Sequence, residues 1–281
     1  MAPIVDLYRA LSELVDQIPE GMVSTPRHLA VALGDPVALR AVVESMKREE
    51  FRNALGKVVD APRPGASIFS DFESDELLKR LAESQMDMSR KIIMNDDFNK
   101  ADRFAGVDAV YYNDEAYAAC VVLDSDLRVL ESASTRDQVR FPYIPGYLMF
   151  REAQAVETAA RLVSGFDVLF VNGHGVAHPR GCGLASCVGL ELDVPSVGVA
   201  RRLLVGNVRK DQNWWSPIMY QEKVVGAELR LGGAPVYVSA GHRISLEMSI
   251  ELVKELTIQG KLPEPLRRAH LEARASGGKR R

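Results

Sequence analysis

The sequence predicts an α/β protein in which a mixed β-sheet carries helices on both faces and a small helical domain precedes it. Three observations support this fold class. Apolar side chains recur at helical spacing from residue 5 to residue 46, short β-rich segments follow each other from 104 to 135, and helical and strand-like segments alternate from 156 to 199. Such alternation is typical of a sheet that is covered by helices on both sides.

Residues 1–56 are expected to form the helical domain. A first helix is predicted over 5–18, because apolar residues line one face until a Pro-Glu-Gly sequence ends the run. A Ser-Thr-Pro sequence then offers an N-cap and a first-turn proline for a short helix over 26–33. After a Gly-Asp-Pro turn, a third helix is predicted over 37–46. This order predicts a helix-turn-helix, winged-helix-like module, although periodicity alone fits a plain three-helix bundle equally well.

A domain boundary is expected in residues 57–72, where Pro, Gly, Ser and Asp accumulate as in a linker or a small wing. The second domain is predicted to cover 73–265 and to begin with an amphipathic helix over 73–94. Residues 266–281 carry an excess of arginine and lysine and are expected to form a basic flexible tail, which could hold a phosphate backbone or be a solvated terminus without a role.

Within the second domain, the segments 104–112, 116–123 and 129–135 are rich in β-formers and separated by acidic turns, which predicts an antiparallel meander. Beyond it the predicted elements are a helix over 156–163, a buried strand over 168–172, a helix over 184–189 and a short strand over 197–199.

Composition excludes several classes of protein. The chain has 281 residues, 47% of them apolar, and a net charge of −3. No apolar run approaches the ~20 residues that a bilayer requires, and the N-terminus lacks the pattern of a signal peptide. Three cysteines without a CxxC pair argue against a disulfide scaffold or a zinc knuckle. We therefore expect a cytoplasmic protein with no membrane partner.

Polar residues concentrate at predicted strand ends, where a rigid scaffold usually presents a functional site. Asp108 interrupts an apolar strand, and a buried carboxylate must be paired, solvated or bound to a metal. Glu152 lies at the start of a helix, the glycine-rich segment 173–180 follows a buried strand, and His242 follows a strand and precedes a helix. A structural ion pair at Asp108 remains the competing interpretation.

These segments resemble, in order along the chain, the endonuclease V family of metal-dependent DNA repair nucleases with a ribonuclease-H-like fold, which nick DNA near deoxyinosine. The resemblance covers about residues 73–265. The motifs that carry it are GVD (106–108), PYIPG (142–146), FRE (150–152), GHGxxHPR (173–180), GLAS (183–186), GVA (198–200) and GH (241–242).

The resemblance implies a catalytic site and a set of partners. It implies that Asp108, Glu152 and the residue at position 172 bind Mg²⁺, with Mn²⁺ as an alternative, and that Arg201 and His242 complete the catalytic group. The implied partner is DNA with deaminated or damaged bases, with inosine-containing RNA as a further candidate. Tyr143 would be the wedge that fills the gap left by a flipped base. The implied DNA contacts are Pro142, Tyr143, Ile144, Pro145, Gly173, His174 and Gly175.

Two positions depart from the family pattern. Asn172 stands where the pattern has a metal-binding aspartate, so the site has one negative charge fewer. Arg201 replaces a lysine, and a guanidinium cannot give up a proton. Two functions therefore stay open: a nuclease with altered metal use, and a non-catalytic protein that recognises lesions in DNA.

The first domain resembles the helix-turn-helix part of alkylguanine-DNA alkyltransferases and alkyltransferase-like proteins. The resemblance rests on the segment 21–46, and it implies that Arg40 inserts into the base stack. An ordinary solvated arginine is the alternative. The segment has no PCHR motif, and no cysteine occurs before Cys120, so the domain lacks the acceptor of alkyl transfer.

Overall fold

The structure, a computed structural model, divides into two compact units. It describes residues 5–98, 100–210, 214–258 and 262–278. The smaller unit joins the chain up to Ser84 with Arg140–Arg151, and the larger unit contains Gln85–Val139 and the chain from Glu152 onward. The expected second domain, 73–265, is thus interrupted, because the segment 140–151 packs in the core of the N-terminal helices.

The smaller unit is a set of short helices, as the sequence predicts. They are α1 (Leu7–Asp16), α2 (Pro26–Ala32), η1 (Pro36–Ala38), α3 (Leu39–Ser45) and η2 (Glu49–Ala54). Thr25 caps α2 by accepting a hydrogen bond from the His28 backbone, and Pro26 takes the first position. The third predicted helix is divided, because Asp35 caps the 3₁₀ turn η1 and α3 starts only after it.

The segment 57–72 belongs to the smaller unit and is no free linker. Parallel bridges join Val23 to Ile68 and Ser24 to Val58. The backbone NH of Phe69 also donates to the carbonyl of Val23. Of the two alternatives for this segment, a linker and a small wing, the bridges favour a small wing on the N-terminal helices.

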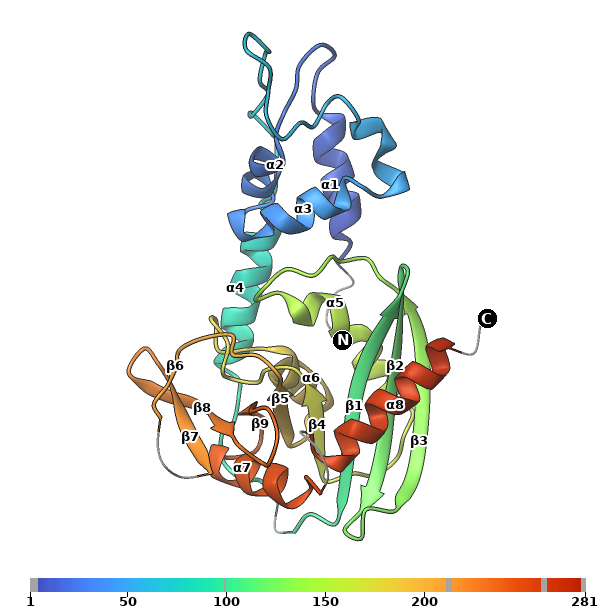
Figure 1. The fold of residues 1–281 in the computed structure, drawn as a ribbon, viewed down its shortest axis with the longest axis vertical. Coiled ribbons are helices and arrows are strands. Elements are labelled where there is room, and N and C mark those ends of the chain that lie inside the picture. The colour runs from blue at the N-terminus through green and yellow to red at the C-terminus, as the bar shows by residue number, and fades with distance from the viewer. Residues whose placement is uncertain (1–4, 99, 211–213, 259–261, 279–281) are drawn as a thin grey trace. The chain divides into compact units, whose positions relative to one another are not determined.

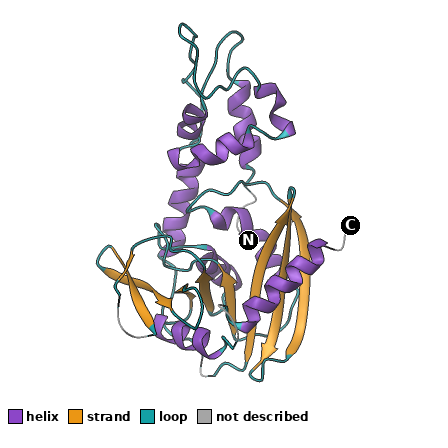
Figure 2. Ribbon diagram, viewed as in Figure 1, coloured by secondary structure: helices purple, strands orange, loops and turns teal. Residues whose placement is uncertain are grey.

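The larger unit contains one nine-stranded mixed sheet in the order β3-β2-β1-β4-β5-β9-β8-β7-β6 (Figures 1 and 2). β1, β4 and β5 are parallel, and the other neighbours are antiparallel. The strands are β1 (Arg103–Tyr112), β2 (Glu115–Asp124), β3 (Val129–Gln138), β4 (Val168–Asn172), β5 (Ser196–Ala200), β6 (Asn207–Val208), β7 (Trp215–Tyr220), β8 (Lys223–Leu229) and β9 (Val236–His242). The meander and both buried strands lie where the sequence predicts them.

Helices cover both faces of this sheet. The remaining helices are α4 (Leu77–Ser89), α5 (Leu148–Arg161), α6 (Leu184–Leu192), α7 (Leu246–Glu255) and α8 (Glu264–Gly278). On β5, Val197 and Val199 belong to the core that α7 and α8 cover. The alternate residue Ser196 lies against Gly189 of α6, so α6 packs on the opposite face. Among the described residues, no helix is long and apolar enough to cross a membrane.

The expectation of a flexible tail from residue 266 is wrong. Residues Glu264–Gly278 form α8, which packs on β1 and β2 and is drawn in red in Figure 1. Leu266, Ala269 and Ala273 are fully buried along one side of this helix. Arg267, Arg268 and Arg274 lie outside this buried stripe of an amphipathic helix, and residues 279–281 lie outside the described part of the chain.

Candidate active site

The candidate site begins with a glycine that lets α8 lie directly on β1. A Cβ atom at Gly106 would come within 2.2 Å of the Pro265 backbone, so only glycine permits this approach. Along β1, the two steps from Gly106 to Asp108 cover about 6.6 Å. Along α8, the four steps from Leu266 to His270 cover about 6 Å. Because the two segments cover similar lengths from the point where Gly106 meets Pro265 and Leu266, His270 lies beside Asp108.

Asp108 is the centre of the site and is 3% exposed. Its Oδ2 atom lies 2.7 Å from Nδ1 of His270. Its Oδ1 atom accepts hydrogen bonds from Nδ2 of Asn172 at 2.8 Å and from its neighbour's backbone NH, that of Ala109, at 2.9 Å. These contacts satisfy a carboxylate that would be costly to bury alone.

The parallel pairing of β1 and β4 explains why Asn172 reaches Asp108. The register pairs Gly106 with Phe170 and Val107 with Val171, so the next residues of the two strands lie side by side. Both strands end there, at the carboxyl edge of the parallel part of the sheet. Neighbouring parallel strands commonly present functional side chains at this edge.

His270 was missed by the sequence analysis, which chose His242. The signal that could have found it is the apolar spacing of Leu266, Ala269 and Ala273, which predicts a helix with His270 beside its buried stripe. The accumulation of arginines led instead to the prediction of a flexible tail.

The structure does not bring His242 to Asp108. His242 pairs with Ser196 on β5, whereas Asn172 pairs with Val199, about 10 Å further along that strand. The Nδ1 atom of His242 accepts a hydrogen bond from the Ile93 backbone, and burial lowers its pKa. The described contacts of His242 are thus with Ile93 and Asp193 and not with Asp108, and they give its expected catalytic role no support.

Glu152 and Arg201 have different environments. Glu152 lies in α5 and is 9% exposed. Arg201 is exposed and follows β5 directly. Because Val199 pairs with Asn172, Arg201 lies at the same edge of the sheet as Asn172. An exposed cation at this edge can contact a phosphate group.

The glycines of the GHG motif serve packing. A Cβ atom at Gly175 would lie 1.9 Å from the carbonyl oxygen of Ala240, and one at Gly198 would lie 2.6 Å from the oxygen of Gly173. This loop therefore passes close to β5 and β9. His174, which lies within it, is half-buried, and desolvation lowers its pKa to about 4. It is uncharged at neutral pH.

The HPR part of this loop, residues 178–180, lies beside Gln85 of α4. Gln85 is fully buried, accepts a hydrogen bond from Nε of Arg180 at 2.7 Å and donates one to the carbonyl of Cys182 at 2.9 Å. Nδ1 of His178 accepts from the Arg180 backbone. These contacts support structural roles for the HPR part of the motif.

The expected DNA-contact residues Pro142–Pro145 and Arg40 lie in the smaller unit. Tyr143 is 61% exposed, and Pro145 is exposed as well, whereas Pro142 and Ile144 are buried. Arg40 is exposed in the first turn of α3. Tyr143 and Arg40 are therefore available to a partner.

The residues around Asp108 suit a divalent cation once the Asn172 amide turns. Carboxylate and amide oxygens are ligands that Mg²⁺ and Mn²⁺ accept. At present Asn172 directs its NH₂ group at Asp108, and half a turn about its last side-chain bond would offer the oxygen instead. Among the described residues, no three Asp, Glu, His or Cys side chains form a metal-binding group, so the amide is essential to the donor set.

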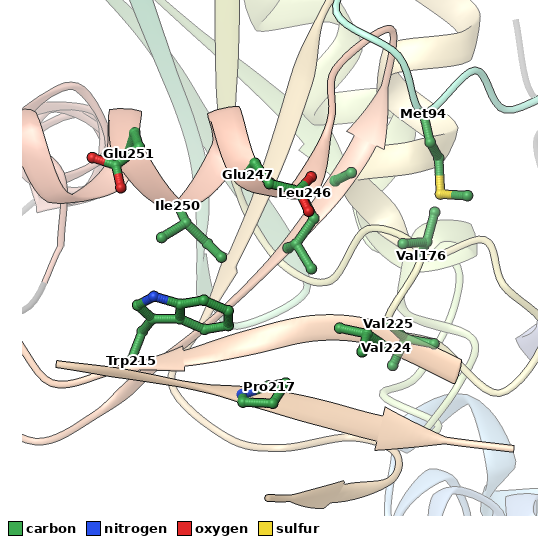
Figure 3. Close-up of a pocket in the computed structure, with 11 residues that line it drawn as sticks. Met94, Val176, Trp215, Pro217, Val224, Val225, Leu246, Glu247, Ile250 and Glu251 are labelled. Atoms are coloured by element: carbon green, nitrogen blue, oxygen red, sulfur yellow. The ribbon is translucent and has the colours of Figure 1, made fainter. Parts of the chain in front are cut away.

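A separate cavity of about 550 Å³ lies between α7 and the β7–β8 hairpin (Figure 3). Its walls are mainly apolar, with Trp215 and Pro217 facing Leu246 and Ile250, and the carboxylates of Glu247 and Glu251 stand on the helix. None of the expected site residues lines it. The cavity and the Asp108 site are therefore distinct places in the larger unit.

Comparison with known proteins agrees with this architecture. The family model described as Endonuclease V matches residues 86–271, which include Asp108, Asn172 and His270. The chain is a member of the endonuclease V family. An endonuclease V of Roseiflexus sp. is 45% identical over 202 residues, which cover 69% of this chain and 90% of that relative.

Two further matches concern the fold and the N-terminal part. A crystal structure of Ciona intestinalis endonuclease V, in complex with DNA containing an inosine followed by a ribo-adenosine, aligns with a TM-score of 0.67 at 25% identity and covers 73% of this chain and 99% of that one. The expected ribonuclease-H-like α/β fold is confirmed. A protein of Picrophilus torridus named bifunctional methyltransferase/endonuclease is 32% identical over 297 residues and covers 95% of both chains. The similarity to that relative therefore extends over almost the whole length of both chains.

Proposed function

We propose that this endonuclease V family member is a DNA repair endonuclease that hydrolyses a phosphodiester bond near deoxyinosine or another deaminated base, with Mg²⁺ or alternatively Mn²⁺. The observation that carries the proposal is the buried Asp108, with Asn172 and His270 on its two oxygens, at the carboxyl edge of β1 and β4. The inosine-containing DNA bound by the Ciona relative supports the choice of substrate.

The residues of the site have different proposed roles in binding the cation and the phosphate. Asp108 and Asn172 would hold the cation, and Glu152 is proposed as a further ligand on the resemblance. A bound divalent cation supplies an activated water and neutralises the charge of the leaving oxygen. His270 fixes the orientation of the Asp108 carboxylate through Oδ2. Arg201, exposed at the same edge, would bind the phosphate next to the scissile bond.

The smaller unit is proposed to grip DNA without chemistry of its own. Tyr143 would stack in the gap that a flipped base leaves, and Arg40 would contact the same duplex. Alkyl transfer is excluded, because the three cysteines of the chain are Cys120, Cys182 and Cys187, which lie in the larger unit and are buried. Burial raises the pKa of Cys120 and Cys182 to about 12, so these thiols stay protonated.

A non-catalytic lesion-binding protein is the second candidate, and one observation favours it. The NH₂ group of Asn172 already occupies Oδ1 of Asp108, which a cation would need. A carboxylate that is hydrogen-bonded to an amide and contacted by an imidazole can be stable without a metal, which suits a protein that binds and does not cut.

Nicking of a labelled duplex with one deoxyinosine tests the choice. The wild type, Asp108→Ala and the double variant Asn172→Asp, Arg201→Lys are compared in Mg²⁺, in Mn²⁺ and in chelator. We expect metal-dependent nicking by the wild type and none by Asp108→Ala. Nicking by the double variant alone would establish the second candidate, and nicking by Asp108→Ala would refute the assigned site.

A further inference from the structure

The loop that carries Tyr143 is anchored by the N-terminal helices. Phe141, Ile144 and Tyr147 are fully buried in the same apolar cluster as residues of α1 and α2. The backbone NH of Leu7, at the start of α1, donates to the carbonyl of Arg140 at 3.0 Å. Residues before and after Tyr143 are thus held by helices more than 100 positions earlier in the chain.

The local chain geometry pushes Tyr143 outward between these anchors. Residues 144–147 form a turn in which the NH of Tyr147 donates to the carbonyl of Ile144 at 3.0 Å. Pro145 and Gly146 occupy its centre, and Gly146 has φ of 80°, as a turn with proline followed by glycine requires. With Phe141 and Ile144 directed into the core, Tyr143 remains 61% exposed.

One polar contact joins this turn to the segment between α2 and η1. The hydroxyl of Tyr147, a residue that is 1% exposed, donates to Oδ2 of Asp35 at 2.6 Å. Asp35 lies in the Gly-Asp-Pro turn before η1 and uses its other oxygen to cap that element, accepting from Val37 at 3.0 Å. A short hydrogen bond to a carboxylate is among the stronger ones in proteins.

The anchoring helices lie outside the residues that the family model matches. The match to the Roseiflexus protein covers 90% of that protein but only 69% of this chain. The match to the family model begins at residue 86. The loop that leads into α5 and to Glu152 is therefore part of the shared nuclease module. In this chain its core contacts come from an added domain.

We propose that the N-terminal helices are a clamp that holds the Tyr143 loop in its projecting form, and that Asp35 and Tyr147 are positioning residues for the recognition of a lesion. The proposal rests on the proposed function in so far as Tyr143 probes the base stack. A rigid aromatic loses little conformational entropy when it inserts, so a loosened loop discriminates less well between damaged and intact DNA.

The test uses the full chain with single substitutions at Tyr147 and Asp35. Tyr147→Phe removes only the hydroxyl, and Asp35→Ala removes both the hydrogen bond and the cap. Asp35→Asn keeps an oxygen that can cap η1 and places an NH₂ group at the Tyr147 hydroxyl, which can accept from it. Tyr117→Phe is the matched control, because Tyr117 is also buried and donates to a carboxylate, Glu115, but lies on β2.

Two readouts separate the clamp from the nuclease. Hydrogen exchange of the amides in 141–147 reports the loop without DNA, and we expect faster exchange in Tyr147→Phe and Asp35→Ala, with rescue in Asp35→Asn. The second readout is the ratio of dissociation constants for intact and inosine-containing duplexes. It should fall about tenfold in Tyr147→Phe and remain unchanged in Tyr117→Phe.

The outcomes are distinct. Unchanged loop exchange in Tyr147→Phe overturns the clamp, whatever the nuclease does. Faster exchange with an unchanged ratio overturns the positioning role. If the wild type itself does not distinguish inosine-containing DNA, the proposed function fails and the positioning role with it, while the exchange experiment still decides whether the helices hold the loop.

Discussion

At the scale of single residues, the chemistry of the site depends on which groups face the two oxygens of Asp108. An amide at position 172 donates a hydrogen bond to this carboxylate, whereas a second carboxylate would repel it. Asn172 therefore stabilises the metal-free protein and weakens the attraction for a cation.

The variant Asn172→Asp tests whether Asn172 raises the stability of the metal-free protein and lowers the affinity for a cation. We expect its free energy of unfolding without metal to fall by about 2 kcal/mol, because a buried hydrogen bond is lost and a like charge added. Its affinity for Mn²⁺, measured by calorimetry, should rise at least tenfold. Asn207→Asp, at an exposed position of β6, is the control for the added charge. Equal Mn²⁺ affinity in both variants would contradict this account.

The buried carboxyl of Glu157, which has no assigned role in the chemistry, makes stability depend on pH. Burial, with a contribution from Glu191, raises the pKa of Glu157 from 4.5 to about 7, and its Oε1 atom has no hydrogen-bond partner. The folded state holds this proton more tightly than the unfolded state, so the stabilisation is complete below pH 4.5 and is lost as the pH rises to about 7.

Glu157→Gln should remove this dependence. Near pH 8 the variant should exceed the wild type in unfolding free energy by about 2–3 kcal/mol, and near pH 4.5 the two should agree. Urea denaturation at both pH values measures the difference. Glu247→Gln, on the exposed side of α7, should change neither value. A constant difference between Glu157→Gln and wild type at all pH values would rule out the titration of Glu157.

At this scale, sequence reasoning found two of the three residues of the Asp108 cluster. Asp108 was recognised because it interrupts an apolar strand, which is a local signal, and Asn172 because it stands at the metal-binding position of the family that the segment resembles. His270 was not, because its role depends on the close approach of α8 to Gly106, a contact between positions far apart in the chain.

At the scale of elements, the packing of α8 on β1 determines whether the site forms. Gly106→Ala would place a methyl group 2.2 Å from the Pro265 backbone, so α8 must shift. We expect a loss of about 1–3 kcal/mol in stability and a larger loss in cleavage, since His270 moves with the helix. Thermal unfolding and a nicking assay measure the two effects.

Gly278→Ala is the control for this change, since a Cβ atom there meets nothing within 4 Å. Wild-type cleavage by Gly106→Ala would show that the approach of α8 to β1 is not needed for the site.

The elements themselves were predictable where their signal is local. The meander and the buried strands β4 and β5 follow from runs of apolar and β-forming residues. The antiparallel strands β6–β8 were missed, because β7 contains Trp215 and Pro217 in a polar context without a clear strand pattern. Its extended form depends on its pairing with β8.

At the scale of the whole molecule, the two units are predicted to contribute different parts of DNA binding. Arg40→Ala should weaken binding to intact and inosine-containing duplexes equally, and the slope of log affinity against log salt should fall by about one. Arg9→Ala, on α1 of the same unit and paired with Glu13, is the control. A selective loss for the inosine duplex would instead assign Arg40 to lesion recognition.

The division into units could be predicted only in outline. The proline-rich segment 57–72 suggested a boundary, but parallel bridges place it in the smaller unit. The return of 140–151 to the N-terminal helices has no sequence signal, because a buried Phe, Ile or Tyr does not reveal which core it joins.

The central claim is that the site formed by Asp108, Asn172 and His270 cuts DNA beside a deaminated base. Single-turnover cleavage of a duplex with one deoxyinosine, in Mg²⁺ and in Mn²⁺, tests it with His270→Ala and His242→Ala as a pair. We predict cleavage by the wild type, a loss of about 100-fold or more in His270→Ala and a change below about threefold in His242→Ala. No cleavage by the wild type in either metal, or equal losses in the two variants, would contradict the claim.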